Sequence, residues 1–317
     1  MSTLDESLSR LTRFIKASRS AKDKWLDLRK LAQTNLYVLA KGILDFKDMD
    51  PVFHGTRCAQ LDTLALPFGR QLDLWPRGHL KTHIITIAKN IQYYLNDNNV
   101  RIMLAASSRE NSMKNLRKIK QIFETNTLLH WLFPECIPDM KGDKWAEMEI
   151  LLPRTKNHPE STFKCIGVGG HITGWHFDVL SKDDLIDEKT ERSPEVMEKI
   201  IDWHLLTKNL LESPTSGIDQ LVGTRWAMFD LYQHVINNER EYTVNRLQAI
   251  DQTTKLPVWA SRFKLDALQE LRIKDPYMYA TQQMNDPRDE AVVDFKANWL
   301  QYYGFSDEAL NILAEVG

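Results

Sequence analysis

The segment LWPRGHLKTH, residues 74–83, decides how this chain is expected to fold. It follows an apolar run that predicts a strand and precedes an amphipathic segment that predicts a helix. A loop in that position binds phosphate when backbone N–H groups converge on the anion, a lysine reaches the β- and γ-phosphates and a hydroxyl binds Mg²⁺. Lys81 and Thr82 supply the lysine and the hydroxyl.

The spelling of this loop departs from the usual G-x4-G-K-[ST] pattern. Trp75 and Leu80 occupy the two glycine positions, and Gly78 lies between them. An exposed Pro-Gly turn that ends in a lysine is the alternative interpretation. If the loop binds a nucleotide, its contacting residues are Pro76, Arg77, Gly78, His79, Leu80, Lys81 and Thr82.

Short apolar runs alternate with helical patterns through most of the chain. The runs that predict strands are 70–75, 100–108, 146–153, 162–170, 176–184, 217–226 and 242–250, and the patterns that predict helices between them are 82–97, 110–126 and 193–212. This alternation indicates an α/β fold with a mainly parallel central sheet flanked by helices. We expect an N-terminal helical segment at 1–50, a core at 51–250 and a small lid or linker subdomain at 251–317.

Composition narrows the class of protein. At 317 residues, with 43% hydrophobic and 26% charged residues, the chain has enough apolar material for a large core. Its three cysteines are widely separated, so neither a zinc site nor a disulfide framework is indicated. No window has the apolar length of a membrane span or a signal core. A net charge of -2 means that any contact with DNA is local, the candidates being the basic stretches 13–24 and 114–120.

A second motif, FDVLSKDDLIDE, begins at Phe177. In phosphate-loop enzymes a carboxylate at the end of a neighbouring strand holds Mg²⁺, and the next acidic residue orients the attacking water. Asp183 and Asp184 fit these two roles. The alternative is a solvated acidic turn. The polar pair Ser181–Lys182 also departs from the apolar pattern of a buried parallel strand.

About a hundred residues separate Lys81 from Asp183, which is room for roughly two extra strand–helix units. We therefore expect a strand to lie between the loop strand and the acidic strand. That order is typical of the additional-strand class of P-loop ATPases.

Taken together, five ordered motifs resemble the ATPase portion of the large terminase subunit of tailed bacteriophages. They are PRGHLKT at 76–82, IMLAASSRENSMKNLRKIKQIFETN with WLFP at 102–134, GVGGHITGWHFDVLSKDD at 167–184, LVGTRWAMFDLY at 221–232 and YATQQMNDP at 279–287. The resemblance covers most of the chain and implies a RecA-like additional-strand P-loop ATPase with ATP and Mg²⁺ as cofactors.

The resemblance also implies residue roles. Lys81 would bind the β- and γ-phosphates, Thr82 and Asp183 would hold Mg²⁺, and Arg77 would stabilise the γ-phosphate. Asp184 would polarise the attacking water, with Glu188 as the fallback because many such ATPases use glutamate. The pair Thr224–Arg225 matches a motif that couples hydrolysis to movement.

The partners implied by the resemblance are double-stranded DNA, a portal protein, a small terminase subunit and further copies of the chain in a ring. The expected setting is the host cytoplasm, at the portal vertex of a procapsid. Arg154 and Arg192 are candidates for an arginine finger supplied to a neighbouring subunit, and Phe53–His54 for contact with adenine. The nuclease domain of the family is expected to be absent from this chain.

Three alternatives stay open on the sequence. One is a helicase-like or remodelling ATPase. Another is a metal-dependent nuclease built on Asp183, Asp184, Asp187 and Glu188. The third is a non-catalytic scaffold with a degenerate loop.

Overall fold

A computed structural model describes residues 21–63, 68–141, 144–188, 193–212 and 217–287. Its centre is a seven-stranded sheet in the order β3-β4-β2-β5-β6-β1-β7. The strands are β1 (Phe68–Leu74), β2 (Ile102–Ala106), β3 (Glu149–Ile150), β4 (Phe163–Gly167), β5 (Val179–Asp183), β6 (Gly217–Gly223) and β7 (Thr243–Arg246). The expected α/β fold with a mainly parallel sheet is confirmed, and each of the seven apolar runs overlaps a strand.

The pairing of β1, β6 and β5 sets the geometry of one sheet edge. Both β1 and β5 pair in parallel with β6, so β6 lies between them. The expected intervening strand is therefore confirmed, but it follows the acidic strand in the sequence rather than preceding it. The strands β2 and β4, which do precede β5 in the sequence, extend the sheet on the other side of β5. Only the short β3, paired to β4, runs antiparallel among the described strands, and it covers two residues of the predicted 146–153 run.

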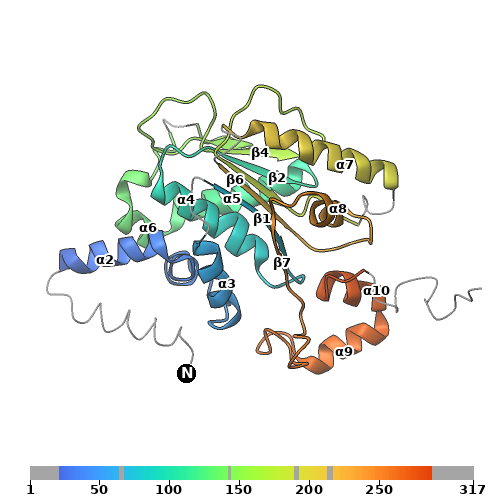
Figure 1. Cartoon of the computed structure of the whole chain (residues 1–317). Helices are drawn as coiled ribbons and strands as arrows, with labels where there is room; N and C mark the ends of the chain where they lie inside the picture. Colours follow the sequence, from blue (N-terminus) through green and yellow to red (C-terminus); the bar gives the residue numbers. More distant parts are fainter. Residues whose placement is uncertain (1–20, 64–67, 142–143, 189–192, 213–216, 288–317) are drawn as a thin grey trace, which may run out of the picture.

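Helices cover both faces of the sheet (Figure 1). One face packs against η1 (Val38–Ile43), α3 (Phe53–Asp62), η2 (Thr82–Lys89), α4 (Asn90–Asn96), α5 (Arg109–Thr125), α6 (Thr127–Leu132) and η3 (Pro134–Cys136). The other packs against α7 (Pro194–Thr207), η4 (Lys208–Leu210) and α8 (Leu231–Asn238). Alternate residues of β2 enter opposite cores, as the two-residue repeat of a strand requires: Ile102 and Leu104 face the first, Met103 and Ala105 the second.

The segments at either end of the described chain also pack on this body. Helix α2 (Ala21–Thr34) contributes Ala32 to the first core, η1 contributes Leu39, and Leu36 enters it from the short segment between them. Near the C-terminal end lie α9 (Leu265–Lys274), α10 (Pro276–Met278) and η5 (Tyr279–Gln283). A small cluster there joins Leu268 of α9 and Tyr279 of η5 with Ala249 and Met284. Among the described residues no helix is long and apolar enough to cross a membrane.

The polar pair in β5 has a partner on each side of the sheet. Ser181 accepts a hydrogen bond from the Asn90 side chain at 2.7 Å. Lys182 is completely buried on the opposite face and pairs with Asp219 of β6 at 2.9 Å, and its ammonium also contacts His204 of α7. Burial lowers the pKa of Lys182, and Asp219 opposes that shift. Because a buried charge is tolerated when it is paired, this ion pair accounts for a lysine in a central strand.

The Lys182–Asp219 pair yields a stability prediction. Lys182→Met leaves the buried Asp219 without its cationic partner, so the free energy of unfolding should fall by about 3–5 kcal/mol, whereas Lys182→Met with Asp219→Leu should restore most of that loss. Denaturant unfolding of both variants measures this. The exposed Lys274–Glu270 pair serves as the control, and Lys274→Ala there should cost less than about 0.5 kcal/mol. A double variant no more stable than the single one contradicts the prediction.

Candidate nucleotide site

Four strands deliver their following residues to the same edge of the sheet. The carboxyl ends of parallel strands meet at one edge, and ligands of open α/β sheets bind there. Hydrogen bonds tie the four ends together: Ser107 N–H donates to the Asp184 carbonyl at 3.1 Å, Asp184 N–H to Val222 at 2.9 Å, and Trp75 N–H to Gly223 at 3.1 Å. The loop after β1, the acidic pair after β5 and Thr224 after β6 are therefore neighbours.

The loop after β1 wraps through two left-handed residues. Gly78 has φ 82° and Leu80 has φ 62°, and η2 begins two residues later at Thr82. Leu80 thus adopts, at the usual glycine position, the backbone conformation that glycine takes most readily. A left-handed leucine costs roughly 1–2 kcal/mol, which the surrounding contacts must offset. One such contact is the packing of the Leu80 side chain on the first core.

Lys81 points its ammonium at the acidic pair. Its Nζ lies 3.1 Å from Oδ2 of Asp184, and the lysine is 8% exposed. Asp184 is itself left-handed, with φ 45°. Because the two residues are about a hundred positions apart in the sequence, this contact depends on the sheet order.

Asp183 faces a cavity of about 480 Å³ that Thr82 also lines. Asn115 of α5 donates to Oδ2 of Asp183 at 3.2 Å, while Oδ1 is buried without a partner among the described residues. Burial raises the pKa of Asp183 to about 6, and the negative charge of Asp184 adds to the rise. A hydroxyl and a buried carboxylate oxygen are hard oxygen ligands, so Thr82 and Asp183 fit Mg²⁺.

A second cavity, of about 310 Å³, lies on the other side of Asp184. Its lining residues are Arg77, Lys81, Ser107, Asn111, Asp184, Ile186, Asp187, Glu188, Thr224, Trp226 and Gln282. Asp184 and Asn111 line both cavities. Asp184 therefore lies between the space that Thr82 and Asp183 line and the space that Arg77 and Lys81 line, and the fallback Glu188 lines the second space.

Arg225 points away from these cavities. The side chain is 2% exposed and donates to the Asp230 carboxylate at 2.9 Å and to the carbonyls of Ala227 and Met228. Asp230 also caps α8 by accepting from Gln233 N–H. The structure therefore places Thr224 at the cavity and the Arg225 side chain under the following turn.

Sequence reasoning missed a set of polar residues of the site that α5 and the turn before it supply. Ser107, Asn111 and Asn115 follow β2 at four-residue spacing, which puts them on one side of the chain as it enters α5. Asn111 donates to Ser107 Oγ at 3.1 Å and Asn115 contacts Asp183. The polar spacing within an otherwise amphipathic helix was the available signal.

The proposed adenine contacts lie in a packed aromatic cluster. Phe53 and His54 meet Trp75, His79 and Trp259 edge to face or tilted, and His79 stacks on Phe263 with ring centroids 4.3 Å apart. Burial lowers the pKa of both His54 and His79 to about 4, so the rings are neutral at pH 7. The cluster packs against Trp75 and His79 and so holds the loop in place.

The other candidates fall in several places. Arg154 donates to the carbonyls of Glu160 and His158, and Arg192 lies outside the described residues. In the basic stretch 114–120, the side chains of Lys114, Arg117 and Lys118 line the cavity with Asp183. Most of the stretch 13–24 lies outside the described residues.

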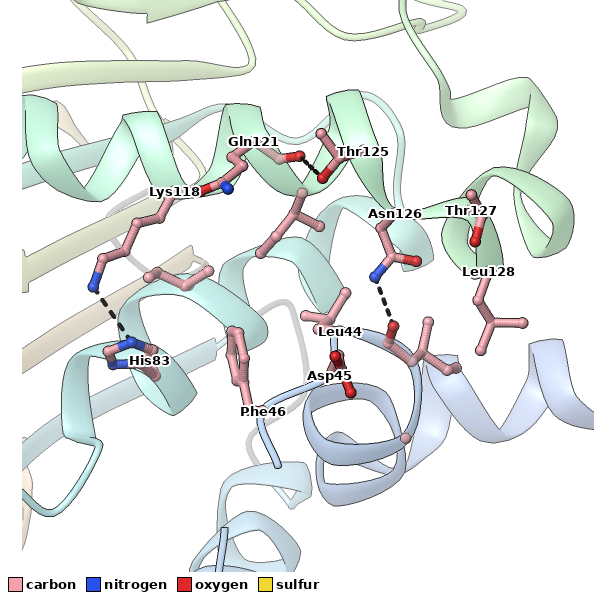
Figure 2. Close-up of a pocket in the computed structure, with 14 residues that line it drawn as sticks. Leu44, Asp45, Phe46, His83, Lys118, Gln121, Thr125, Asn126, Thr127 and Leu128 are labelled. Carbon is pink, nitrogen blue, oxygen red and sulfur yellow. Dashed lines mark hydrogen bonds between the residues drawn. The ribbon is translucent and has the colours of Figure 1, made fainter. Parts of the chain in front are cut away.

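A third cavity, of about 660 Å³, lies beside the site (Figure 2). Residues 42–46, α5 and the start of α6 form its walls. His83, which follows Thr82, contacts Lys118 at 3.3 Å and meets Phe46 edge to face. Lys118 also lines the cavity with Asp183, so the two cavities share one cationic wall residue.

Within the described residues, no group of three or more His, Cys, Asp or Glu side chains is arranged to hold a metal ion. No protein-family model matches the chain, and no curated protein matches it either.

The backbone at Leu80 predicts an inverted order of two substitutions. Both Leu80→Gly and Leu80→Ala remove the side chain, but alanine keeps a Cβ at φ 62°, so the glycine variant should be the more stable by about 1 kcal/mol. Leu205, inside α7, is the matched control, because there alanine should exceed glycine by about 1 kcal/mol. Thermal unfolding of the four variants measures the order. Alanine ahead of glycine at both positions contradicts a left-handed Leu80.

Proposed function

We propose that this protein hydrolyses ATP at the edge formed by the loop after β1 and the acidic pair after β5. The observation that carries the proposal is the convergence of Lys81, Thr82, Asp183 and Asp184 at one place, with the Lys81 ammonium 3.1 Å from Asp184. These four groups supply the cation, the hydroxyl and the two carboxylates that phosphoryl transfer to water requires.

The strand order supports a RecA-like P-loop ATPase of the additional-strand class. One parallel strand, β6, separates the loop strand from the acidic strand, as that class requires. The loop runs directly into η2, so the first N–H groups of that helix point toward the space that phosphate would occupy. The positive φ of Leu80 supports the same interpretation, because it gives this loop the wrap that glycine gives others.

Each residue has a chemical task in this proposal. Lys81 and the loop N–H groups bind the β- and γ-phosphates, Arg77 neutralises charge that develops on the γ-phosphate, and Asp184 accepts a proton from the attacking water. Mg²⁺ held by Thr82 and Asp183 would supply further charge neutralisation. Asn115 keeps the Asp183 carboxylate oriented by its hydrogen bond to Oδ2.

We further propose that hydrolysis drives double-stranded DNA into a viral procapsid, as the resemblance to large terminase subunits implies. Motifs spread over about two hundred residues support this proposal, because they converge on two adjoining cavities. The cavities are lined by residues of the PRGHLKT loop, Ser107, the KDD pair, Thr224 and Gln282. The partners would be a portal protein, a small terminase subunit and neighbouring copies in a ring. The setting would be the host cytoplasm.

Turnover of ATP by purified protein tests the first proposal. Lys81→Ala and Asp184→Asn should each lower kcat by about 100-fold, because each removes a charge that acts in the transition state. Lys274→Ala and Asp266→Asn, on the exposed side of α9, are matched controls that should leave kcat unchanged.

Two results would sink the proposal. DNA cleavage that requires Mg²⁺ and persists in Lys81→Ala would assign the acidic residues to a nuclease. Failure of the wild-type chain to bind ATP in the presence of Mg²⁺ would favour a scaffold. Stimulation of ATP turnover by double-stranded DNA, compared with single-stranded DNA, separates a packaging motor from a helicase-like enzyme.

A further inference from the structure

The segment 279–285, called here the closing segment, belongs to the nucleotide site although it is about two hundred residues from the loop in sequence. It comprises η5 and the two residues after it. Its polar side chains are buried: Thr281 is 0%, Gln282 2% and Asn285 0% exposed. Buried polar groups need partners. Thr281 donates to the Tyr277 carbonyl, whereas Gln282 and Asn285 bond to residues that follow β6 and β7.

Gln282 connects the loop to the end of β6. Its carbonyl accepts a hydrogen bond from Arg77 N–H at 2.8 Å. Its side-chain Nε2 donates to the Arg225 carbonyl at 3.1 Å. Gln282 also lines the 310 Å³ cavity together with Lys81, Asp184 and Thr224. One residue therefore touches the loop, the segment after β6 and the space between them.

Asn285 fixes the same segment from a second direction. Its Oδ1 accepts from Arg225 N–H at 3.0 Å, and its Nδ2 donates to the Leu247 carbonyl after β7 at 2.8 Å. The backbone N–H and carbonyl of Arg225 are thus both held by the closing segment. Asn285 is left-handed, with φ 50°, which the two hydrogen bonds of its side chain help to offset.

The consequence is a hydrogen-bonded connection between the loop after β1 and the segment after β6. Arg77 is one of the exposed loop residues, whereas Thr224 is buried at the end of β6. A displacement of the Arg77 N–H group would strain its hydrogen bond to the Gln282 carbonyl. The Gln282 side chain would pass that strain to the Arg225 carbonyl, to which it donates. The Arg225 side chain is locked to Asp230 at the start of α8, so the displacement continues into that helix.

We propose that Gln282 is a positioning residue for ATP hydrolysis: it holds Arg77 and the Thr224–Arg225 segment in one unit at the edge of the cavity. The inference rests on the proposed function and deepens it. The closing segment then acts in turnover, because it places Arg77 relative to the transferred phosphate. Affinity for ATP comes instead from Lys81 and the loop N–H groups.

Gln282→Met tests this because it preserves the side-chain volume and removes the donor. We expect kcat for ATP to fall about tenfold, since small misplacements of a catalytic group are costly, with KM for ATP within about twofold of wild type. Gln282→Glu places a carboxylate against the Arg225 carbonyl, so its kcat for ATP should fall at least as far as that of Gln282→Met. Gln269→Met is the matched control: Gln269 is exposed on α9, outside the closing segment, so kcat should not change.

Hydrogen exchange on the unaltered chain provides a second readout that does not depend on a variant folding. Addition of Mg²⁺ with a non-hydrolysable ATP analogue should slow exchange at the Arg77 and Arg225 amides together, because Gln282 and Asn285 hold both. Protection of Arg77 without Arg225 would overturn the inference.

The kinetic outcomes separate this inference from the function on which it rests. If wild type hydrolyses ATP and Lys81→Ala does not, but Gln282→Met keeps wild-type kcat, the positioning role is overturned and the ATPase stands. A raised KM with unchanged kcat in Gln282→Met would also overturn it, because that result assigns the residue to binding. No hydrolysis by wild type would overturn both.

Discussion

The parallel pairing of β6 with β1 on one side and β5 on the other is the constraint on which the site depends. The register matches Leu74 with Gly223 and Asp183 with Val222, so the three strands end at nearly the same level. Two strand spacings, about 9–10 Å, separate the loop strand from the acidic strand. That gap is short enough for the Lys81 side chain to span, and the buried Lys182–Asp219 pair links β5 to β6 below it.

Strained backbone gathers at this edge. Leu80, Asp184 and Asn285 are non-glycine residues with positive φ, and each lies in or against the two cavities or the segment that closes them. Such conformations cost roughly 1–3 kcal/mol each and persist where the surrounding structure determines them. The packing of Leu80 on the first core, the aromatic cluster around the loop and the hydrogen bonds between strand ends supply that determination. Part of the free energy gained by packing the sheet thus offsets the cost of three left-handed backbone residues.

Much of the fold could be predicted from apolar runs and turn residues, because alternate burial on two faces leaves a pattern in each strand. The loop and the acidic pair were also readable, since Lys81, Thr82, Asp183 and Asp184 are local motifs. The contact between Lys81 and Asp184 depends on the strand order. The length of chain between the two residues suggested that one strand lies between the loop strand and the acidic strand, but the strand that does so, β6, follows the acidic strand in the sequence. Gln282 was not foreseen, because a side chain that acts through a contact distant in sequence leaves no local pattern. Asn115 left only the four-residue spacing of polar residues that begins at Ser107. Lys182 departs from the apolar pattern of a buried strand, and its partner Asp219 on β6 explains that departure.

The closing segment also bears on how the chain is assembled during synthesis. A ribosome delivers the loop, the acidic pair and Thr224 long before it delivers Gln282 and Asn285, and domains of a nascent chain begin folding from the N-terminal side. Until residue 285 has left the exit tunnel, the Arg225 carbonyl lacks the donor that it has in the finished protein. The segment after β6 would therefore stay incompletely bonded until late in synthesis, and the candidate nucleotide site would be the last part of the described body to be completed.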